Sequence, residues 1–271
     1  MSEPRFVLGE KVSAPTLYSP EVLYPIARAH ARDTLGYSDE IPMFGVDHWH
    51  LYELSWLNSG RSPEVFVGRL TVPARSECIV ESKSLKLYLN SLNFTVFETT
   101  EHARQTIIAD VSEILRCQAQ LELFNAVSED LTGGLLQGEN LDQYAQVAIA
   151  DYPDASLIEV KPGTKVAKSW YTHRLRSLCP ITAQPDWASV QIVWEGPNIG
   201  SESLMQYLLG YYQHQEYHEQ CVERIYLDLL RRFQPELIFV QAFYTRRGGI
   251  DITPFRANQP NAAPLTRLMR Q

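Results

Sequence analysis

The chain carries one order of secondary-structure signals twice. Segments with the β-branched and aromatic character of strands come in pairs, and two segments with apolar residues at helical spacing lie between the pairs. For the first half we predict two strands, two helices and two strands at 47–56, 64–72, 81–92, 99–115, 121–127 and 144–150. For the second half the same order is predicted at 178–182, 188–194, from Ser201 onward, and at 217–233, 237–244 and 250–254.

This repetition indicates an internal duplication of a β-β-α-α-β-β domain rather than a solenoid of short repeats. The expected fold class is α+β. We expect an N-terminal arm at 1–40 with a short helix at Pro20–Thr34, then modules at 41–155 and 156–271. Residues 151–176 read as a connector between the two modules.

Composition excludes several classes of protein. The formal net charge of −8 over 271 residues argues against a general nucleic-acid coat, which needs a basic face. No run of about 18 apolar residues is present, so no transmembrane helix is expected. The N-terminus lacks the pattern of a signal peptide. The four cysteines form no CxxC pair, so we expect a reduced, cytoplasmic protein.

A thiol and a carboxylate lie seven residues apart in a segment that contains two prolines, Cys179–Trp187. Pro180 and Pro185 bias the residues before them toward extended geometry, which predicts a loop or a strand end. Such a place can hold reactive side chains against a pocket. The pair Cys179 and Asp186 then reads as a nucleophile and a proton donor, or else as a buried cysteine and a turn aspartate.

The start of the predicted C-terminal helix carries His218 and Glu219. A carboxylate there is stabilised by the helix dipole, which suits either a plain helix end or a ligand with paired N–H donors, such as a guanine-like base. His214, His218 and Cys221 have a conceivable metal-binding spacing, but no fourth ligand is evident.

Two segments have the composition of anion-binding sites. Arg246-Arg247-Gly248-Gly249 combines phosphate-binding side chains with backbone that a phosphate can approach closely, although a solvated hairpin turn has the same composition. Ser82, Lys83, Ser84 and Lys86 open a predicted helix, whose free N–H groups attract anions. Neither a Rossmann fingerprint nor a Walker pattern accompanies them.

Taken together, four blocks resemble the 7-cyano-7-deazaguanine reductase family, the NADPH-dependent nitrile reductases of queuosine biosynthesis in tRNA modification. The blocks are Glu81–Asn93, Leu178–Trp187, Glu216–Ile225 and Tyr244–Ile252. The similarity spans roughly residues 40 to 271, in the long, two-module form of the family. It implies tandem tunnelling-fold (T-fold) modules, each an antiparallel sheet backed by two helices, in a homodimer.

The resemblance also implies roles for individual residues. Cys179 attacks the nitrile carbon to form a covalent thioimide, and Asp186 donates protons. A thiolate is a strong nucleophile, and Arg174 or Arg176 is placed to favour it. The other implied positions are Val80, Glu81, Ser82, His218 and Glu219 for substrate and Ser82, Lys83, Arg247 and Gly248 for NADPH.

Two NADPH molecules serve each turnover, as co-substrates, and no metal is required. The implied partner is a small 7-deazaguanine substrate, with no direct nucleic-acid binding and no membrane. Tyr217 is placed to stack on the base. Two alternatives remain: a pterin- or purine-binding enzyme of the GTP cyclohydrolase-like type, which needs a zinc set of Cys and His, and a non-catalytic purine-binding module, which needs no nucleophile.

Overall fold

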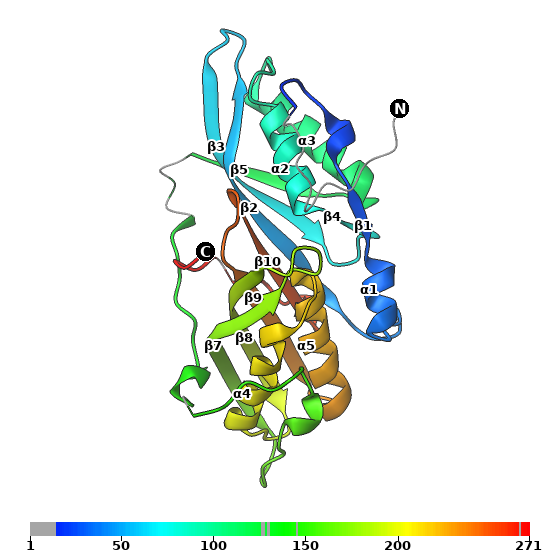
Figure 1. Cartoon of the computed structure of the whole chain (residues 1–271), viewed down its shortest axis with the longest axis vertical. Helices are drawn as coiled ribbons and strands as arrows, with labels where there is room; N and C mark the ends of the chain where they lie inside the picture. Colours follow the sequence, from blue (N-terminus) through cyan, green and yellow to red (C-terminus); the bar gives the residue numbers. More distant parts are fainter. Residues whose placement is uncertain (1–14, 126–127, 129–130, 145, 266) are drawn as a thin grey trace. The chain divides into compact units, whose positions relative to one another are not determined.

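The computed structural model describes residues 15–125, 128, 131–144, 146–265 and 267–271, which form two compact units (Figure 1). Unit 1 holds the described chain up to Ala31, then Asp47–Thr132 and Arg246–Ile252. Unit 2 holds Arg32–Val46, Gly133–Thr245 and Thr253–Gln271. Each unit is therefore discontinuous in sequence. The module boundaries at 41–155 and 156–271, with an arm at 1–40, stay a prediction.

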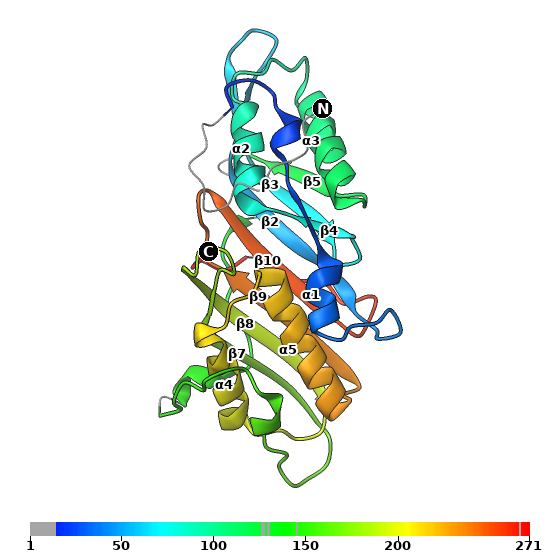
Figure 2. The ribbon, with the colours of Figure 1, turned by 45° about the vertical axis from the view of Figure 1, so that its right-hand side comes forward.

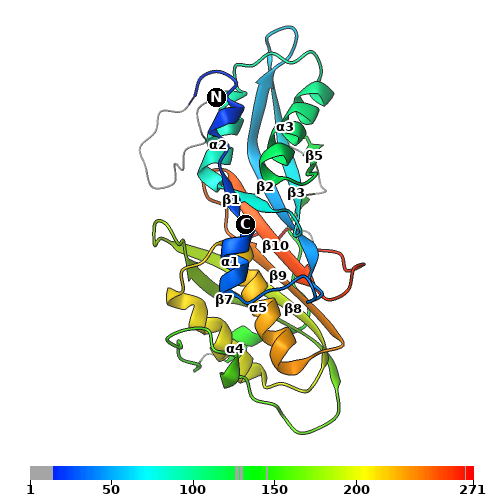
Figure 3. The same cartoon turned by 90° about the vertical axis from the view of Figure 1, so that its right-hand side faces the viewer.

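In unit 1, two helices cover one face of a sheet (Figure 3). The sheet has the order β5 (Gln120–Phe124), β3 (Pro63–Pro73) and β2 (Phe44–Leu57), and β3 and β5 are antiparallel. A separate pair joins β1 (Pro25–Ala27) to β4 (Cys78–Val80). The helices are α2 (Ser82–Ser91) and α3 (Thr100–Leu115), whose apolar stripes enter one core with the sheet.

Both helices of unit 1 begin at a side-chain cap. The Glu81 carboxylate caps α2, and the Thr99 hydroxyl accepts a hydrogen bond from the N–H of His102 at the start of α3. Leu85 and Tyr88, predicted to lie on the apolar face of the first helix, are both fully buried. The helices predicted at 81–92 and 99–115 are thereby confirmed.

The strands of unit 2 have the order β10 (Ile250–Ala257), β9 (Leu237–Tyr244), β8 (Pro185–Gly196), β7 (Val166–Leu178) and β6 (Glu139–Asn140), and β10 belongs to this unit from Thr253 onward. Neighbours from β10 to β7 are antiparallel, and β6 runs parallel to β7. The helices α4 (Ser201–Leu209) and α5 (His218–Phe233) lie on one face of this sheet (Figure 2). Their buried faces form a core with the inward side of β7, β8 and β9.

Short elements connect these layers. A seven-residue helix, α1 (Arg28–Thr34), spans the change from unit 1 to unit 2 after Ala31. The 3-10 turns are η1 (Pro20–Val22), η3 (Leu141–Gln143), η4 (Ala155–Leu157) and η5 (Gly210–Gln213). The helix predicted at Pro20–Thr34 is wrong over its first half, because η1 and the strand β1, which begins at Pro25, occupy it.

The order predicted for the second half is confirmed, since β7, β8, α4, α5, β9 and β10 follow one another in sequence. The strand predicted at 178–182 is wrong beyond Leu178, because β7 ends there and a turn follows. Reading 151–176 as a connector was wrong over its last part, because β7 begins at Val166. Polar side chains, such as the exposed His173 and the half-buried Lys168, interrupt the apolar pattern of this strand, while Trp170 and Thr172 are buried.

The strand predicted at 144–150 is also wrong. Its described residues, all except 145, form turn and irregular structure. Tyr144 ends η3, and the N–H of Val147 donates to the Tyr144 carbonyl, which closes a turn. Both side chains pack against the core of unit 2, so their apolar spacing reflects a packed loop rather than a strand.

A search of the described helices finds none that is long and apolar enough to cross a bilayer.

Candidate active site

The loop between β7 and β8 carries the cysteine that the sequence singled out. The N–H of Cys179 donates to the Gln184 carbonyl at 2.9 Å, and the N–H of Ala183 donates to the Cys179 carbonyl at 2.9 Å. Ala183 has a left-handed φ of 53°, which closes this tight loop. Cys179 is buried. The prediction of a loop at the end of a strand is confirmed.

Two further backbone hydrogen bonds tie the end of β7 to the segment before α5. The N–H of Leu178 donates to the His214 carbonyl at 2.8 Å, and the N–H of Glu216 donates to the Leu178 carbonyl at 3.1 Å. The start of α5 is therefore fixed next to the loop of Cys179. Residues far apart in the sequence meet here because of strand pairing and not because of a local motif.

Asp186 and His218 are in contact. Asp186 is the second residue of β8 and His218 is the first residue of α5. The Nε2 atom of His218 lies 3.3 Å from the Oδ2 atom of Asp186, and both side chains are largely buried. The imidazole ring also stacks on Tyr244, with ring centroids 3.8 Å apart. A carboxyl group that an imidazole contacts, at the end of a loop that carries a thiol, suits proton transfer during nucleophilic addition.

Glu219 and Tyr217 flank His218. Glu219 is 3 % exposed and lies in the first turn of α5, where the dipole favours its negative charge. Tyr217 is the N-cap residue of α5 and is half-buried, without a side-chain capping bond. The predicted contact of Glu219 with the substrate, and the stacking of Tyr217 on it, stay predictions.

A buried ionic cluster that the sequence did not single out supports this helix start. Glu216 accepts hydrogen bonds from Arg224 and Gln220, and its Oε1 atom lies 3.1 Å from Nε2 of His214. Burial alone would raise the pKa of Glu216, but its bonds with His214 and Arg224 outweigh burial and lower that pKa. The cluster holds the segment before α5 with a negative charge on Glu216.

These contacts also separate the three residues that have a metal-binding spacing. His214 faces Glu216 and His218 faces Asp186. Cys221 is fully buried, and burial strongly raises the pKa of its thiol. Within the described parts of the chain, no cluster of three or more His, Cys, Asp or Glu side chains could hold a metal ion.

Arg176, expected to favour the Cys179 thiolate, is held by aromatic side chains. Its guanidinium lies 4.4 Å from the ring centroid of Tyr212 and 5.6 Å from that of Trp187, and it donates to the Tyr212 carbonyl. Arg174 lies where the pairing of β7 with β8 shifts in register. The structure therefore gives Arg176 a role in fixing Trp187, the neighbour of Asp186.

Unit 1 holds the other predicted substrate residues at the start of α2. The carboxylate of Glu81 accepts hydrogen bonds from the N–H groups of Lys83 at 2.7 Å and Ser84 at 2.8 Å. Burial raises the pKa of Glu81, although these two bonds act in the opposite direction. Val80 ends β4 and Ser82 begins α2. Glu81 thus caps the helix whatever else it binds.

The turn between β9 and β10 is also in unit 1 and contacts α2. Gly248 and Gly249 have positive φ angles of 59° and 79°, which glycine adopts without strain. The Nζ atom of Lys86, on α2, donates to the Gly248 carbonyl at 2.7 Å. Lys86, which the sequence placed at the opening of the predicted helix, therefore joins α2 to the turn that carries Arg247 and Gly248. The binding of a cofactor by these positions stays a prediction.

Residues of β2 shape the same turn. The N–H of Tyr52 donates to the Gly249 carbonyl at 2.9 Å, and Arg246 lies 4.2 Å from the centroid of the Tyr52 ring. The Tyr52 hydroxyl donates to Asp251 at 2.5 Å, and Nδ1 of His50 lies 2.6 Å from the same carboxylate. No local signal in the sequence pointed to this buried network.

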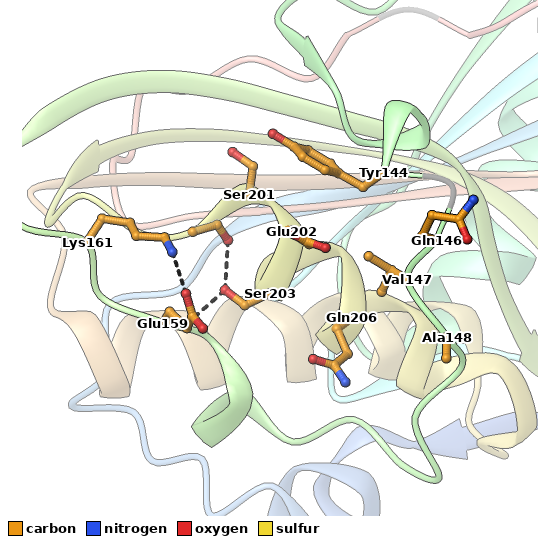
Figure 4. Close-up of a pocket in the computed structure, with 11 residues that line it drawn as sticks. Tyr144, Gln146, Val147, Ala148, Glu159, Lys161, Ser201, Glu202, Ser203 and Gln206 are labelled. Atoms are coloured by element: carbon orange, nitrogen blue, oxygen red, sulfur yellow. Dashed lines mark hydrogen bonds and ion pairs between the residues drawn. The ribbon is translucent and has the colours of Figure 1, made fainter.

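A cavity of about 570 Å³ lies elsewhere in unit 2 (Figure 4). Lys161 and Glu159 form an ion pair at its edge, and the start of α4 provides one wall. None of the predicted site residues lines it. The lining residues are Tyr144, Gln146, Val147, Ala148, Glu159, Lys161, Gly200, Ser201, Glu202, Ser203 and Gln206.

Comparison with known proteins gives the family. Residues 15–123 match the family described as "Nitrile reductase, 7-cyano-7-deazaguanine-reductase N-term", and residues 185–263 match the family described as "QueF-like protein". The chain is 42 % identical over 273 residues to the NADPH-dependent 7-cyano-7-deazaguanine reductase of Acinetobacter baumannii strain SDF, covering 100 % of both chains.

Two further relatives carry the same name. The protein of Acinetobacter baylyi is 41 % identical, over 98 % of this chain and 100 % of its own length. The protein of Psychrobacter cryohalolentis is 41 % identical over 98 % of both chains. The fold of paired strands and helices, the cysteine loop and these full-length similarities agree, and the chain belongs to the 7-cyano-7-deazaguanine reductase family.

Proposed function

We propose that the chain reduces the nitrile of 7-cyano-7-deazaguanine to the aminomethyl group of 7-aminomethyl-7-deazaguanine, with NADPH as the reductant, in the biosynthesis of queuosine for tRNA. The observation that carries the assignment is the arrangement in unit 2 of a thiol loop beside a buried carboxyl–imidazole pair, Asp186 and His218. Full-length similarity to reductases of this name supports the same substrate.

In this proposal, the sulfur of Cys179 forms a bond to the nitrile carbon, and the nitrile nitrogen gains a proton, which gives a thioimide. Two hydrides, supplied by two NADPH molecules in turn, convert that carbon to the methylene of a primary amine. After the first hydride, the carbon–sulfur bond breaks and the thiolate of Cys179 leaves. The nitrogen must gain protons as the carbon is reduced, and Asp186 is the proposed donor.

Recognition of the base in unit 2 is assigned to Glu219 and His218 at the start of α5. In unit 1, the positions assigned to substrate are Val80, Glu81 and Ser82. A buried carboxylate such as Glu219 suits the N–H edge of a deazaguanine. A site built on such hydrogen bonds rejects analogues that lack them, because its polar groups would then be left unpaired.

The NADPH phosphates are assigned to Ser82, Lys83, Arg247 and Gly248. The contact of Lys86 with Gly248 supports this assignment, since it joins the start of α2 to the glycine turn. Backbone N–H groups at a helix start and arginine side chains are both established ways of binding phosphate. The proposal also includes a homodimer that acts in the cytoplasm without binding nucleic acid.

The test is to mix the protein with 7-cyano-7-deazaguanine in the absence of NADPH and to record the intact mass and the absorbance spectrum. A covalent adduct should form, and Cys179→Ala should abolish it. Cys117→Ala is the matched control, because Cys117 lies at the end of α3 in unit 1, outside the assigned site. Failure of the wild-type protein to form an adduct or to oxidise NADPH would disprove the assignment.

A further inference from the structure

We propose that Tyr244 is a positioning residue, whose ring sets the plane of the His218 imidazole and thereby orients the Asp186 carboxyl group toward the reacting nitrogen. This inference rests on the proposed function, because it concerns the delivery of protons during nitrile reduction.

Strand register places the residues involved on one face of the unit 2 sheet. Asp186 on β8 is paired with Ser177 on β7, and Ala188, two residues further along β8, is paired with Tyr244 on β9. Side chains alternate across a strand and cross-strand partners share a face, so Asp186, Ser177 and Tyr244 point the same way. Ala188 and Tyr244 belong to the core that α5 covers.

The contact between Tyr244 and His218 is close and nearly parallel. The two ring centroids are 3.8 Å apart and the ring planes differ by 12°. An imidazole on a helix start can rotate about its side-chain bonds, and a ring lying flat against it removes that freedom. In the observed plane, Nε2 of His218 lies 3.3 Å from Asp186.

The other ring nitrogen of His218 is available to a ligand. Nδ1 is buried and makes no hydrogen bond to any described residue. A buried polar atom normally has a partner, so the position suits a substrate group that hydrogen-bonds to the imidazole. In the plane set by Tyr244, Nε2 of His218 faces Asp186 and Nδ1 is left for the substrate.

Tyr244 is itself held firmly in the core. It is 1 % exposed, and its hydroxyl is buried without a hydrogen bond to any described residue. Burial raises the pKa of Tyr244 well above its usual value, so the ring stays neutral beside Asp186. The hydroxyl thus lies in the core, while the ring face meets His218. The proposal accordingly depends on the ring and not on the hydroxyl.

Three variants separate these contributions. Tyr244→Phe keeps the ring, and Tyr244→Leu removes it. Phe243→Leu is the matched control: Phe243 is the neighbour on β9, is equally buried, and packs in a different cluster with Leu136 and Leu268. The measurements are the rate of adduct formation with 7-cyano-7-deazaguanine alone and the steady-state turnover with NADPH.

We expect Tyr244→Phe to stay within about threefold of the wild type. Tyr244→Leu should slow both rates by about 10²-fold, the size of effect that a misplacement of about 1 Å produces. Phe243→Leu should retain the wild-type rates. Wild-type rates in Tyr244→Leu, or equal losses in the Phe and Leu variants, would overturn the proposal.

A double-mutant cycle tests whether Tyr244 acts through His218. If it does, Tyr244→Leu should cause no further loss in a His218→Ala background, because the two residues act as a unit. Independent, additive losses would overturn the proposal. Absence of an adduct in the wild type would instead contradict the proposed function itself, so the two failures are distinguishable.

A measurement on the folded wild type covers the case in which Tyr244→Leu does not fold. The carbon-bound ring protons of His218, assigned by comparison with His218→Gln, should resonate upfield in the wild type and in Tyr244→Phe, because they lie over an aromatic ring. Ordinary shifts for these protons in both proteins would show that the stack does not form.

Discussion

Arg256 of β10 and Glu223 of α5 form an ion pair inside unit 2. The Nη2 atom of Arg256 lies 2.8 Å from Oε1 of Glu223, and the two side chains are 0 % and 3 % exposed. Arg32 also reaches this carboxylate, at 2.7 Å. Helix α5 and strand β10 are therefore joined by a pair of charges that is almost fully buried.

Removing one member of this cluster should be costly. Arg256→Met leaves the Glu223 carboxylate buried with Arg32 as its remaining ion-pair partner. We expect the free energy of unfolding to fall by about 3–5 kcal/mol. The control is Arg69→Met, which breaks the exposed pair with Glu122 and should cost about 0–1 kcal/mol. Denaturant unfolding followed by circular dichroism measures both. Similar losses in the two variants would contradict this account.

Asp186→Asn should separate catalysis from binding. The amide keeps the size of the side chain but cannot donate a proton as a carboxylic acid does, so turnover should fall by about 10²–10⁴-fold. Affinity for 7-cyano-7-deazaguanine, measured by calorimetry in a Cys179→Ala background, should change far less. An equally active Asp186→Asn variant would remove Asp186 from its proposed role.

Glu81→Ala should lower both stability and activity, because Glu81 caps α2 and is assigned to the substrate. The loss of a cap costs about 1 kcal/mol. Thr99→Ala removes the cap of α3 in the same unit and should cost a similar amount while leaving turnover intact. If Thr99→Ala lost activity to the same degree, the effect of Glu81 would be one of stability alone.

Gly249→Ala should weaken the glycine turn. A Cβ atom there would lie 2.5 Å from Cδ of Glu53, and the φ angle is 79°. We expect a stability loss of about 1–3 kcal/mol from strain and a raised KM for NADPH. Gly60→Ala is the control, since Gly60 lies in a turn of unit 1 without a positive φ angle. An unchanged KM in Gly249→Ala would argue against the cofactor assignment.

Two carboxyl groups of unit 2 should give opposite pH dependences of stability. The pKa of Glu216 in the folded protein is lowered from 4.5. Its contribution to the free energy of unfolding is therefore present above pH 4.5 and is lost as the pH falls through the pKa of the folded state. Burial raises the pKa of Asp228 from 3.8, so its contribution is present below pH 3.8 and is lost as the pH rises through its folded value.

The free energy of unfolding of Glu216→Gln and Asp228→Asn, measured from pH 3 to pH 7, checks these signs. The difference in free energy of unfolding between the wild type and Glu216→Gln should become smaller as the pH falls. The free energy of unfolding of the wild type should increase relative to that of Asp228→Asn as the pH falls. The same slope in both variants would contradict the two assignments.

The amphipathic helices were predictable because their signals are local. Spacing placed Leu85 and Tyr88 on a buried face, and Pro180 predicted the loop after β7, since backbone sterics act between neighbouring residues. The strand at Val166–Leu178 escaped prediction because polar side chains interrupt its apolar pattern. Residues 144–150 were taken for a strand because of their apolar spacing, but the described ones form a packed loop. Packing against a distant element, and not propensity, decides such segments.

The sequence by itself determined the element order of unit 2, the cysteine loop and, through four blocks of residues, the family. Only the tertiary structure decided which side chains meet: Asp186 with His218, His218 with Tyr244, and Lys86 with Gly248. Each of these contacts joins elements that are distant in the sequence, and depends on strand register or helix placement. Such long-range contacts leave no local pattern, because the residues around one partner in the sequence do not identify the other partner on a distant element.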